Sequence, residues 1–251
     1  MTTADTSHSP LICALTKPAT GAPLHIVPSA GSTPLTLVQL ARAIDPPRQI
    51  YSFKAAGVED QREPHATIGE MAAAYVAEIL ETQPSGPYLI AGHCFGGVIA
   101  YEMAAQLENQ GQRVALLSLL DTFLPVRADA SITPEVDMGE WEIKLTEALT
   151  DVYKQARGQL TQVPPDLAQK FERVLNLQIR AGISYRCRPV QCPIAMIRTP
   201  SHDDFLFQYW ESMSADGYTQ LDIQGDSFSI LKPPQVESLG KRWGALLAHH
   251  S

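Results

Sequence analysis

The chain has 251 residues, of which 45% are hydrophobic and 18% charged, the balance of a globular protein that can bury a sizeable core. Its net charge of −8 disfavours binding to nucleic acid or to an anionic membrane surface, and no apolar run reaches the roughly 18 residues of a membrane span. The four cysteines, Cys13, Cys94, Cys187 and Cys192, are too few and too scattered for a disulfide framework, which favours a cytoplasmic location.

The first segment, residues 1–22, has neither the charged start nor the apolar run of a signal peptide, and we expect it to be a flexible leader or linker. Residues 24–27 then predict a short strand that runs into the turn "PSAGST". The apolar residues of "LTLVQLARAI" recur at helical spacing, and "RQIYSF" predicts a second strand.

A strong helix is predicted for "HATIGEMAAAYVAEILETQ", because its apolar residues follow the i, i+3, i+4, i+7 pattern. Thr67, followed three residues later by Glu70, indicates a capping box at its start. The run "PYLIAG" is apolar without alternation, as in a strand covered on both faces. A helix, "GVIAYEMAAQLENQG", follows and stops at Gly111, and "RVALLSLLD" predicts another buried strand.

From about residue 126 to 188 the chain is more polar, and "EWEIKLTEALTDVYKQ" and "PPDLAQKFERVLNLQIRAG" predict helices. Strands return with "CPIAMIR" and "YTQLDI". The last helix, "PPQVESLGKRWGALLAHH", is expected to bury Val236, Leu239, Trp243 and Leu246. This alternation predicts the α/β class, with a mostly parallel central sheet flanked by helices. The block at 126–188 is then a helical lid insertion in a single domain spanning residues 23–251.

The segment GHCFG, residues 92–96, lies between a predicted buried strand and a predicted helix, which is the context of a nucleophile elbow. A turn that sharp leaves no room for side chains two positions before and after the nucleophile, hence the glycines. The following helix would direct its N-terminus at Cys94 and so lower the thiol pKa. The alternative interpretation is a buried cysteine that acts as a small hydrophobic residue.

Two further elements belong to such a site. The loop after the first strand would supply the N–H of Ser29, which forms an oxyanion hole together with the N–H of Phe95. Asp121 follows the strand after the elbow helix, so both residues would meet at the carboxyl edge of the sheet. The alternatives are a plain Gly/Pro turn for the first segment and a turn-starting Asp for the second.

From about residue 23 to 243 the chain resembles a thioesterase domain of nonribosomal peptide and polyketide synthases, a branch of the α/β-hydrolases. The resemblance rests on "PLHIVPSAGS", "GPYLIAGHCFGG", "LLDTFLP" and "GDSFSILKPPQVESL". It implies that an acyl or peptidyl chain passes from the phosphopantetheine arm of a carrier protein onto the nucleophile. Such a domain binds no cofactor of its own, and its substrate is a small-molecule acyl chain.

Two positions depart from the family pattern. The family usually has Ser at the elbow, where this chain has Cys94, and its closing motif Gly-Asp-His-Phe reads GDSF here, with Ser227 in the position of the catalytic His. His202, in "RTPSHDDF", follows a strand that ends near the Asp121 strand and is an alternative base. Nothing in the sequence completes a metal shell around "HDD", so no metal is expected.

Three functions remain open on this basis. The first is acyl transfer through Cys94, with release by cyclisation to a lactone or lactam or by hydrolysis. The second is a cysteine-dependent shuttle that moves aminoacyl groups between carrier proteins. The third is a variant without a base that binds the acyl-carrier or traps the acyl-enzyme. A thiol at its ordinary pKa is already a few per cent thiolate at neutral pH, which favours the first two.

Overall fold

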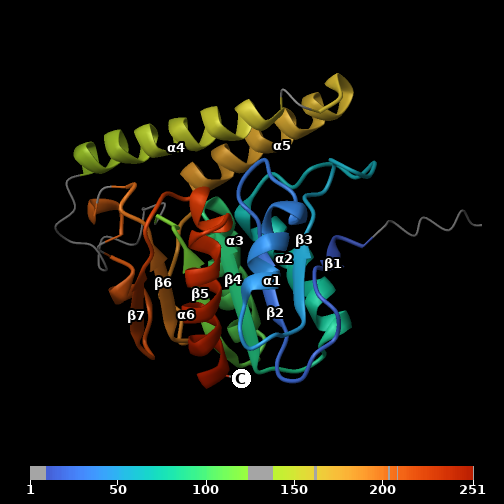
Figure 1. The fold of residues 1–251 in the computed structure, drawn as a ribbon. Helices are drawn as coiled ribbons and strands as arrows, with labels where there is room; N and C mark the ends of the chain where they lie inside the picture. Colours follow the sequence, from blue (N-terminus) through green and yellow to red (C-terminus); the bar gives the residue numbers. More distant parts are fainter. Residues whose placement is uncertain (1–9, 124–137, 161–162, 203, 208, 251) are drawn as a thin grey trace, which may run out of the picture.

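The computed structural model describes residues 10–123, 138–160, 163–202, 204–207 and 209–250. A seven-stranded sheet crosses the centre of the molecule in the order β1-β3-β2-β4-β5-β6-β7 (Figure 1). Only β1 runs antiparallel to its neighbour, so the predicted mostly parallel sheet is confirmed. The strands are β1 Ile12–Ala14, β2 Leu24–Val27, β3 Ile50–Phe53, β4 Tyr88–His93, β5 Val114–Leu120, β6 Ile194–Arg198 and β7 Tyr218–Asp222.

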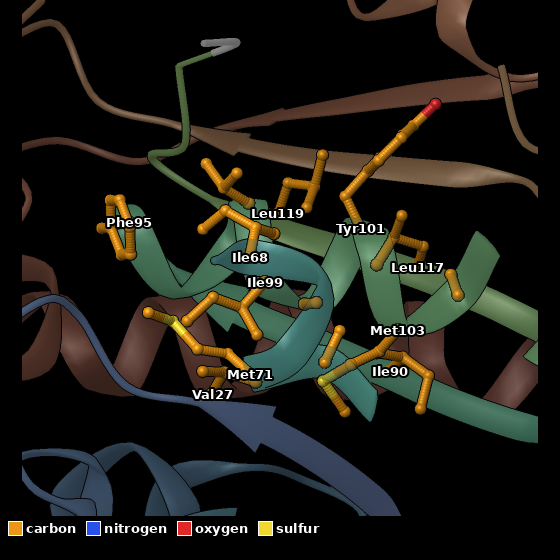
Figure 2. Close-up of a cluster of buried hydrophobic side chains, with 14 of the residues drawn as sticks. Val27, Ile68, Met71, Ile90, Phe95, Ile99, Tyr101, Met103, Leu117 and Leu119 are labelled. Atoms are coloured by element: carbon orange, nitrogen blue, oxygen red, sulfur yellow. The ribbon is translucent and has the colours of Figure 1, made fainter. Parts of the chain in front are cut away.

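Helices cover both faces of this sheet and enclose two hydrophobic clusters. On one face α2 (Ile68–Thr82) and α3 (Phe95–Asn109) pack on alternate residues of β4 and β5, such as Ile90 and Leu117 (Figure 2). On the other face α1 (Val38–Ala43) and α6 (Gln235–His249) pack on the residues between them. Because both faces are buried, β4 and β5 are continuous apolar runs in the sequence.

Two long helices, α4 (Met138–Leu160) and α5 (Pro165–Ser184), lie across one end of the sheet (Figure 1). Both fall within residues 126–188, where the sequence predicts a helical lid, although residues 124–137 lie outside the described part. Short 3-10 turns complete the connections: η1 Pro34–Leu37, η2 Asp204–Leu206, η3 Glu211–Met213 and η4 Ser229–Leu231.

The start of α2 has the capping box that the sequence predicts. The Thr67 side chain accepts a hydrogen bond from the Glu70 N–H at 3.1 Å, and the Glu70 carboxylate accepts one from the Thr67 N–H at 3.2 Å. Two N–H groups that the first helical turn leaves without partners are thereby satisfied.

The structure differs from the sequence expectations in two places. Part of the expected leader, Ile12–Ala14, forms the edge strand β1 against β3, since its backbone groups pair with those of residues 51–53. In α6 the fourth fully buried apolar residue is Leu247, whereas Leu246 is only partly buried, because the helix turns its neighbour toward the sheet.

Membrane insertion finds no support in the described segments. None of their helices combines the length and the apolar character that crossing a bilayer requires.

The turn between β4 and α3 is built from glycines that sit against neighbouring backbone. A Cβ on Gly92 would lie 2.2 Å from the Gly96 carbonyl oxygen, and one on Gly96 would lie 2.3 Å from the Pro28 carbonyl oxygen. A Cβ on Gly97 would collide with the Thr122 side chain at 1.9 Å. These contacts bring the loop after β2, the elbow and the end of β5 together, so the three glycines fix the relative positions of these segments.

Replacing Gly92 by Ala should therefore lower the free energy of unfolding by more than ~3 kcal/mol or prevent folding, because the obstructing atoms are backbone. Gly158→Ala is the matched control: Gly158 lies on an exposed part of α4, and a Cβ added there would meet no atom within 4 Å. This second change should stabilise the protein by about 0.5–1 kcal/mol. Urea denaturation measures both. Equal stabilities for the two variants would contradict this account of the turn.

Candidate active site

Cys94 occupies the strained position of the turn between β4 and α3. Its backbone has φ 51° and ψ −122°, a conformation that L-residues rarely adopt. Its N–H donates to the Leu120 carbonyl at 2.7 Å, and its carbonyl accepts from Thr122 Oγ1 at 3.0 Å. The strain is thus maintained by hydrogen bonds to the end of β5, as expected for a nucleophile elbow.

The thiol of Cys94 is almost fully buried, with 1% exposure. Burial raises its pKa to about 11, and the negative charge of Asp121 adds to this, while the Ser29 hydroxyl and the Phe95 N–H act in the opposite direction. The start of α3 does lower the thiol pKa through the Phe95 N–H, but the net shift is upward. Desolvation of a thiolate outweighs the two donors and the helix dipole.

The loop after β2 lies directly against the elbow. Gly96 approaches the Pro28 carbonyl so closely that Ser29 is placed next to the start of α3. The Ser29 side chain is buried, and its backbone N–H donates to none of the described residues. Further along the loop, the Gly31 N–H donates to Gln178 Oε1 of α5 at 3.0 Å. The two N–H groups predicted for an oxyanion hole, those of Ser29 and Phe95, thus lie on adjoining segments beside the thiol.

Asp121 follows β5 and is completely buried, with φ 50°. Its N–H donates to the Ile197 carbonyl at 2.7 Å, which anchors it to the end of β6. Its Oδ1 accepts from the Thr199 N–H at 3.0 Å, and its Oδ2 from Thr199 Oγ1 at 2.9 Å. A buried carboxylate needs such donors, because they replace the water that it has lost.

Ser227 and His202 complete the cluster around this carboxylate. Ser227 Oγ donates a short hydrogen bond to Asp121 Oδ2. His202 Nε2 lies 3.2 Å from Ser227 Oγ and 3.7 Å from Asp121 Oδ2. The loop after β7 thus brings a hydroxyl to the acid, and the loop after β6 brings the imidazole. Ser227, in the position of the family's His, and His202, the alternative base, thus lie at the same carboxylate.

Several residues of this cluster were not identified from the sequence. Thr199 binds both oxygens of Asp121, and Ser201 Oγ lies 3.4 Å from Oδ2. The buried His93, inside the elbow, has its Nε2 2.6 Å from the Ser227 carbonyl oxygen. It therefore holds the loop that carries Ser227. The position of "RTPS" directly after a buried strand was the available signal for Thr199 and Ser201.

A cavity of about 120 Å³ adjoins the imidazole and the Ser227 hydroxyl on the side of α4. Its lining combines polar and apolar side chains: Asp151, Val152, Ser201, His202, Asp226, Ser227 and Phe228. Within the described ranges, no group of three or more His, Cys, Asp or Glu residues is arranged to hold a metal ion. The described groups of the site are a thiol, a buried carboxylate, an imidazole, hydroxyls and backbone donors.

The comparisons with known proteins agree with this geometry. The chain is 27% identical over 249 residues to indigoidine synthase from Dickeya dadantii (strain 3937), covering 87% of this chain and 16% of that protein. It is 38% identical over 109 residues to the dimodular nonribosomal peptide synthase of Bacillus subtilis (strain 168), covering 42% and 5% of the two chains. It thus spans well under a fifth of the length of these relatives.

Among solved structures, the Vlm2 thioesterase domain, which carries genetically encoded 2,3-diaminopropionic acid bound with a dodecadepsipeptide, is 25% identical. The superposition has a TM-score of 0.71 and covers 95% of this chain and 98% of that one. The family model described as "Thioesterase domain" matches residues 22–242. With this match over most of its length, and with an elbow, an acid and an α/β-hydrolase sheet in the expected places, the chain belongs to the thioesterase domain family.

Proposed function

We propose that this thioesterase domain takes an acyl or peptidyl chain from the phosphopantetheine thioester of a carrier protein onto Cys94 and then releases it. The observation that carries the proposal is the strained backbone of Cys94 at the start of α3, where the thiol lies near the Ser29 hydroxyl and the Phe95 N–H and within the field of a buried acid. The match to a nonribosomal peptide synthase supports a carrier-bound substrate. The four cysteines are free, which suits a reducing cytoplasm.

The first step exchanges one thioester for another. The Cys94 sulfur attacks the carbonyl carbon of the acyl group, and the N–H groups of Ser29 and Phe95 stabilise the negative charge on the carbonyl oxygen. The bond to the pantetheine sulfur then breaks, and the thiol proton passes to that leaving sulfur. One C–S bond forms and one breaks, so the step is nearly isoenergetic.

Release distinguishes the possible products. The loop that supplies the family's catalytic His presents Ser227 here, and a hydroxyl is not a base at neutral pH. Activation of water normally needs a base worth ~10²–10⁴-fold, whereas an amine or a thiol needs it less. An amine that closes a lactam therefore depends less on a base than the hydroxyl that closes a lactone or the water that hydrolyses the chain. The same difference supports the second candidate, a shuttle that passes the acyl group to the thiol of another carrier protein.

Mixing the protein with an acyl-loaded carrier protein should add one acyl mass to the chain, read by intact mass spectrometry. Cys94→Ala should abolish the adduct, since the thiol is the only part of the elbow that can form the bond. Cys192→Ala serves as the matched control and should leave it unchanged, because Cys192 is buried beside Glu108. An adduct that maps to Cys13, Cys187 or Cys192 would contradict the assignment.

Offering the acyl-enzyme an unacylated holo carrier protein separates the candidate products. Transfer of the acyl mass to the second carrier identifies a shuttle, whereas loss of water from the released chain relative to the free acid identifies cyclisation. Release of the linear acid identifies hydrolysis. An acyl-enzyme that persists with every acceptor would contradict a releasing function and leave the variant that traps the acyl-enzyme.

Alkylation of Cys94 by iodoacetamide should continue to accelerate as the pH rises above 9, because burial raises the thiol pKa from 9.0 to about 11 and only the thiolate reacts. The thiol is neutral below its pKa, so the rate at neutral pH should be far below that of a free thiolate. Mass spectrometry of the peptide that contains Cys94 gives the rate, and circular dichroism verifies folding at each pH. A plateau near pH 7 would show an ionised thiol instead.

A further inference from the structure

The geometry points to His202 as the proton acceptor of this site, a base supplied from the loop after β6 in place of the family's His on the loop after β7. Asp121 orients it, both directly and through the Ser227 hydroxyl. The inference rests on the proposed acyl transfer at Cys94 and identifies the group that makes that transfer possible.

A chain of hydrogen bonds sets the protonation of the imidazole. Ser227 Oγ donates its proton to Asp121 Oδ2, so the lone pairs of the Ser227 oxygen are left to accept. His202 Nε2, at 3.2 Å, is then the donor to Ser227 Oγ, and at 3.7 Å it also faces the Asp121 carboxylate. With its proton on Nε2, a neutral imidazole carries its free lone pair on Nδ1.

The surroundings of the ring keep it in this orientation. Phe123 contacts it edge-on at 5.7 Å between ring centroids, and Phe207 lies at 6.5 Å on another side. No described residue hydrogen-bonds to Nδ1. The ring is mostly shielded but reaches the 120 Å³ cavity, with 17% of its side chain exposed. An acceptor molecule that enters the cavity can therefore meet an imidazole whose opposite edge is held by the acid.

The other described histidines do not meet these conditions. His25 is buried on β2, and its pKa is lowered to about 4 by desolvation. His93 is buried inside the elbow, where desolvation lowers its pKa, and its Nε2 lies against the Ser227 carbonyl. His65 precedes α2 and is surrounded by Arg62, Asp60 and Glu70, which lie away from the Asp121 cluster. His249 and His250 end α6, at the far end of the sheet from α4 and α5 (Figure 1).

The buried thiol of Cys94 requires a base that removes its proton. Since desolvation keeps Cys94 protonated at neutral pH, the sulfur has to lose its proton as it attacks. Ser227, the residue in the family's base position, donates to Asp121 and cannot take that proton. An imidazole beside the same acid can, because the lone pair on its free nitrogen accepts a proton.

The protons balance in both half-reactions. In acylation, His202 takes the proton of the Cys94 thiol and gives it to the pantetheine sulfur as that C–S bond breaks. In release, it takes the proton of the incoming amine, hydroxyl, thiol or water. It returns this proton to the Cys94 sulfur as the new bond to the acyl carbon forms and the thioester bond breaks. The Asp121 carboxylate stabilises the transient imidazolium.

His202→Ala should slow both formation and release of the acyl-enzyme by ~10²–10⁴-fold, the usual contribution of a general base. Rapid quenching followed by intact mass spectrometry gives both rates with an acyl-loaded carrier protein. His249→Ala is the matched control, a histidine removed from the exposed end of α6, and should leave both rates unchanged. Unaltered rates in His202→Ala would overturn the inference.

Two rescues distinguish a base from a residue that only supports the loop. Free imidazole should restore part of the activity of His202→Ala, because the variant enlarges a cavity that already borders the ring. The double variant His202→Ala, Ser227→His should recover activity too, since it returns an imidazole to the family's position beside Asp121. Failure of both rescues in a protein that keeps its melting temperature would assign His202 a structural role and overturn the proposal.

If His202→Ala fails to fold, His202→Asn keeps a donor to Ser227 without a base and should show the same loss of rate. Failure of the proposed function and failure of the role of His202 give different results. An unmodified parent protein, with no acyl mass at Cys94, contradicts the proposed function. A parent that is acylated and releases its chain, next to a His202→Asn variant with the same rates, contradicts only the role of His202.

Discussion

The carboxylate of Asp121 is buried without contact to water, and the arrangement of the site depends on how its charge is satisfied. Donors come from two separate loops: the Thr199 N–H and hydroxyl with the Ser201 hydroxyl after β6, and the Ser227 hydroxyl after β7. Each bond replaces lost hydration, so leaving any donor out would be costly. The loops that carry the functional groups are therefore held together by one charge.

The same charge explains how a thioesterase domain can carry a hydroxyl where its family has an imidazole. Ser227 is shorter than His and leaves space beside Asp121, and His202 from the neighbouring loop lies close enough to share the acid. In the proposed site Asp121 follows β5, and the imidazole beside it follows β6 instead of β7. Parallel strands end at one edge of the sheet, so such an exchange needs no change of fold.

The nucleophile shows two opposing effects of this architecture. The Phe95 N–H at the helix start and the Ser29 hydroxyl of the adjoining loop stabilise the thiolate, but burial removes water from it. Burial has the larger effect, and the thiol remains protonated in the closed structure. A cysteine in this setting is protected from adventitious reaction until a base and a substrate are both present. This makes a proton acceptor as necessary here as in sites with serine.

The sequence alone determined the α/β class, the strand and helix order, the capping box at Thr67 and the elbow at Cys94, because these follow from local periodicity, glycine spacing and turn chemistry. It also indicated Asp121, whose place after a buried strand implies the carboxyl edge of the sheet. The pairing of Ile12–Ala14 with β3 was decided by tertiary structure, since a three-residue edge strand has no periodicity of its own. Tertiary structure also decided three features of the site. These are the donors from Thr199 and Ser201, the proximity of His202 to Asp121, and the raised pKa of Cys94. These depend on which loops meet in space and how much water they exclude, and no local pattern in the chain specifies either.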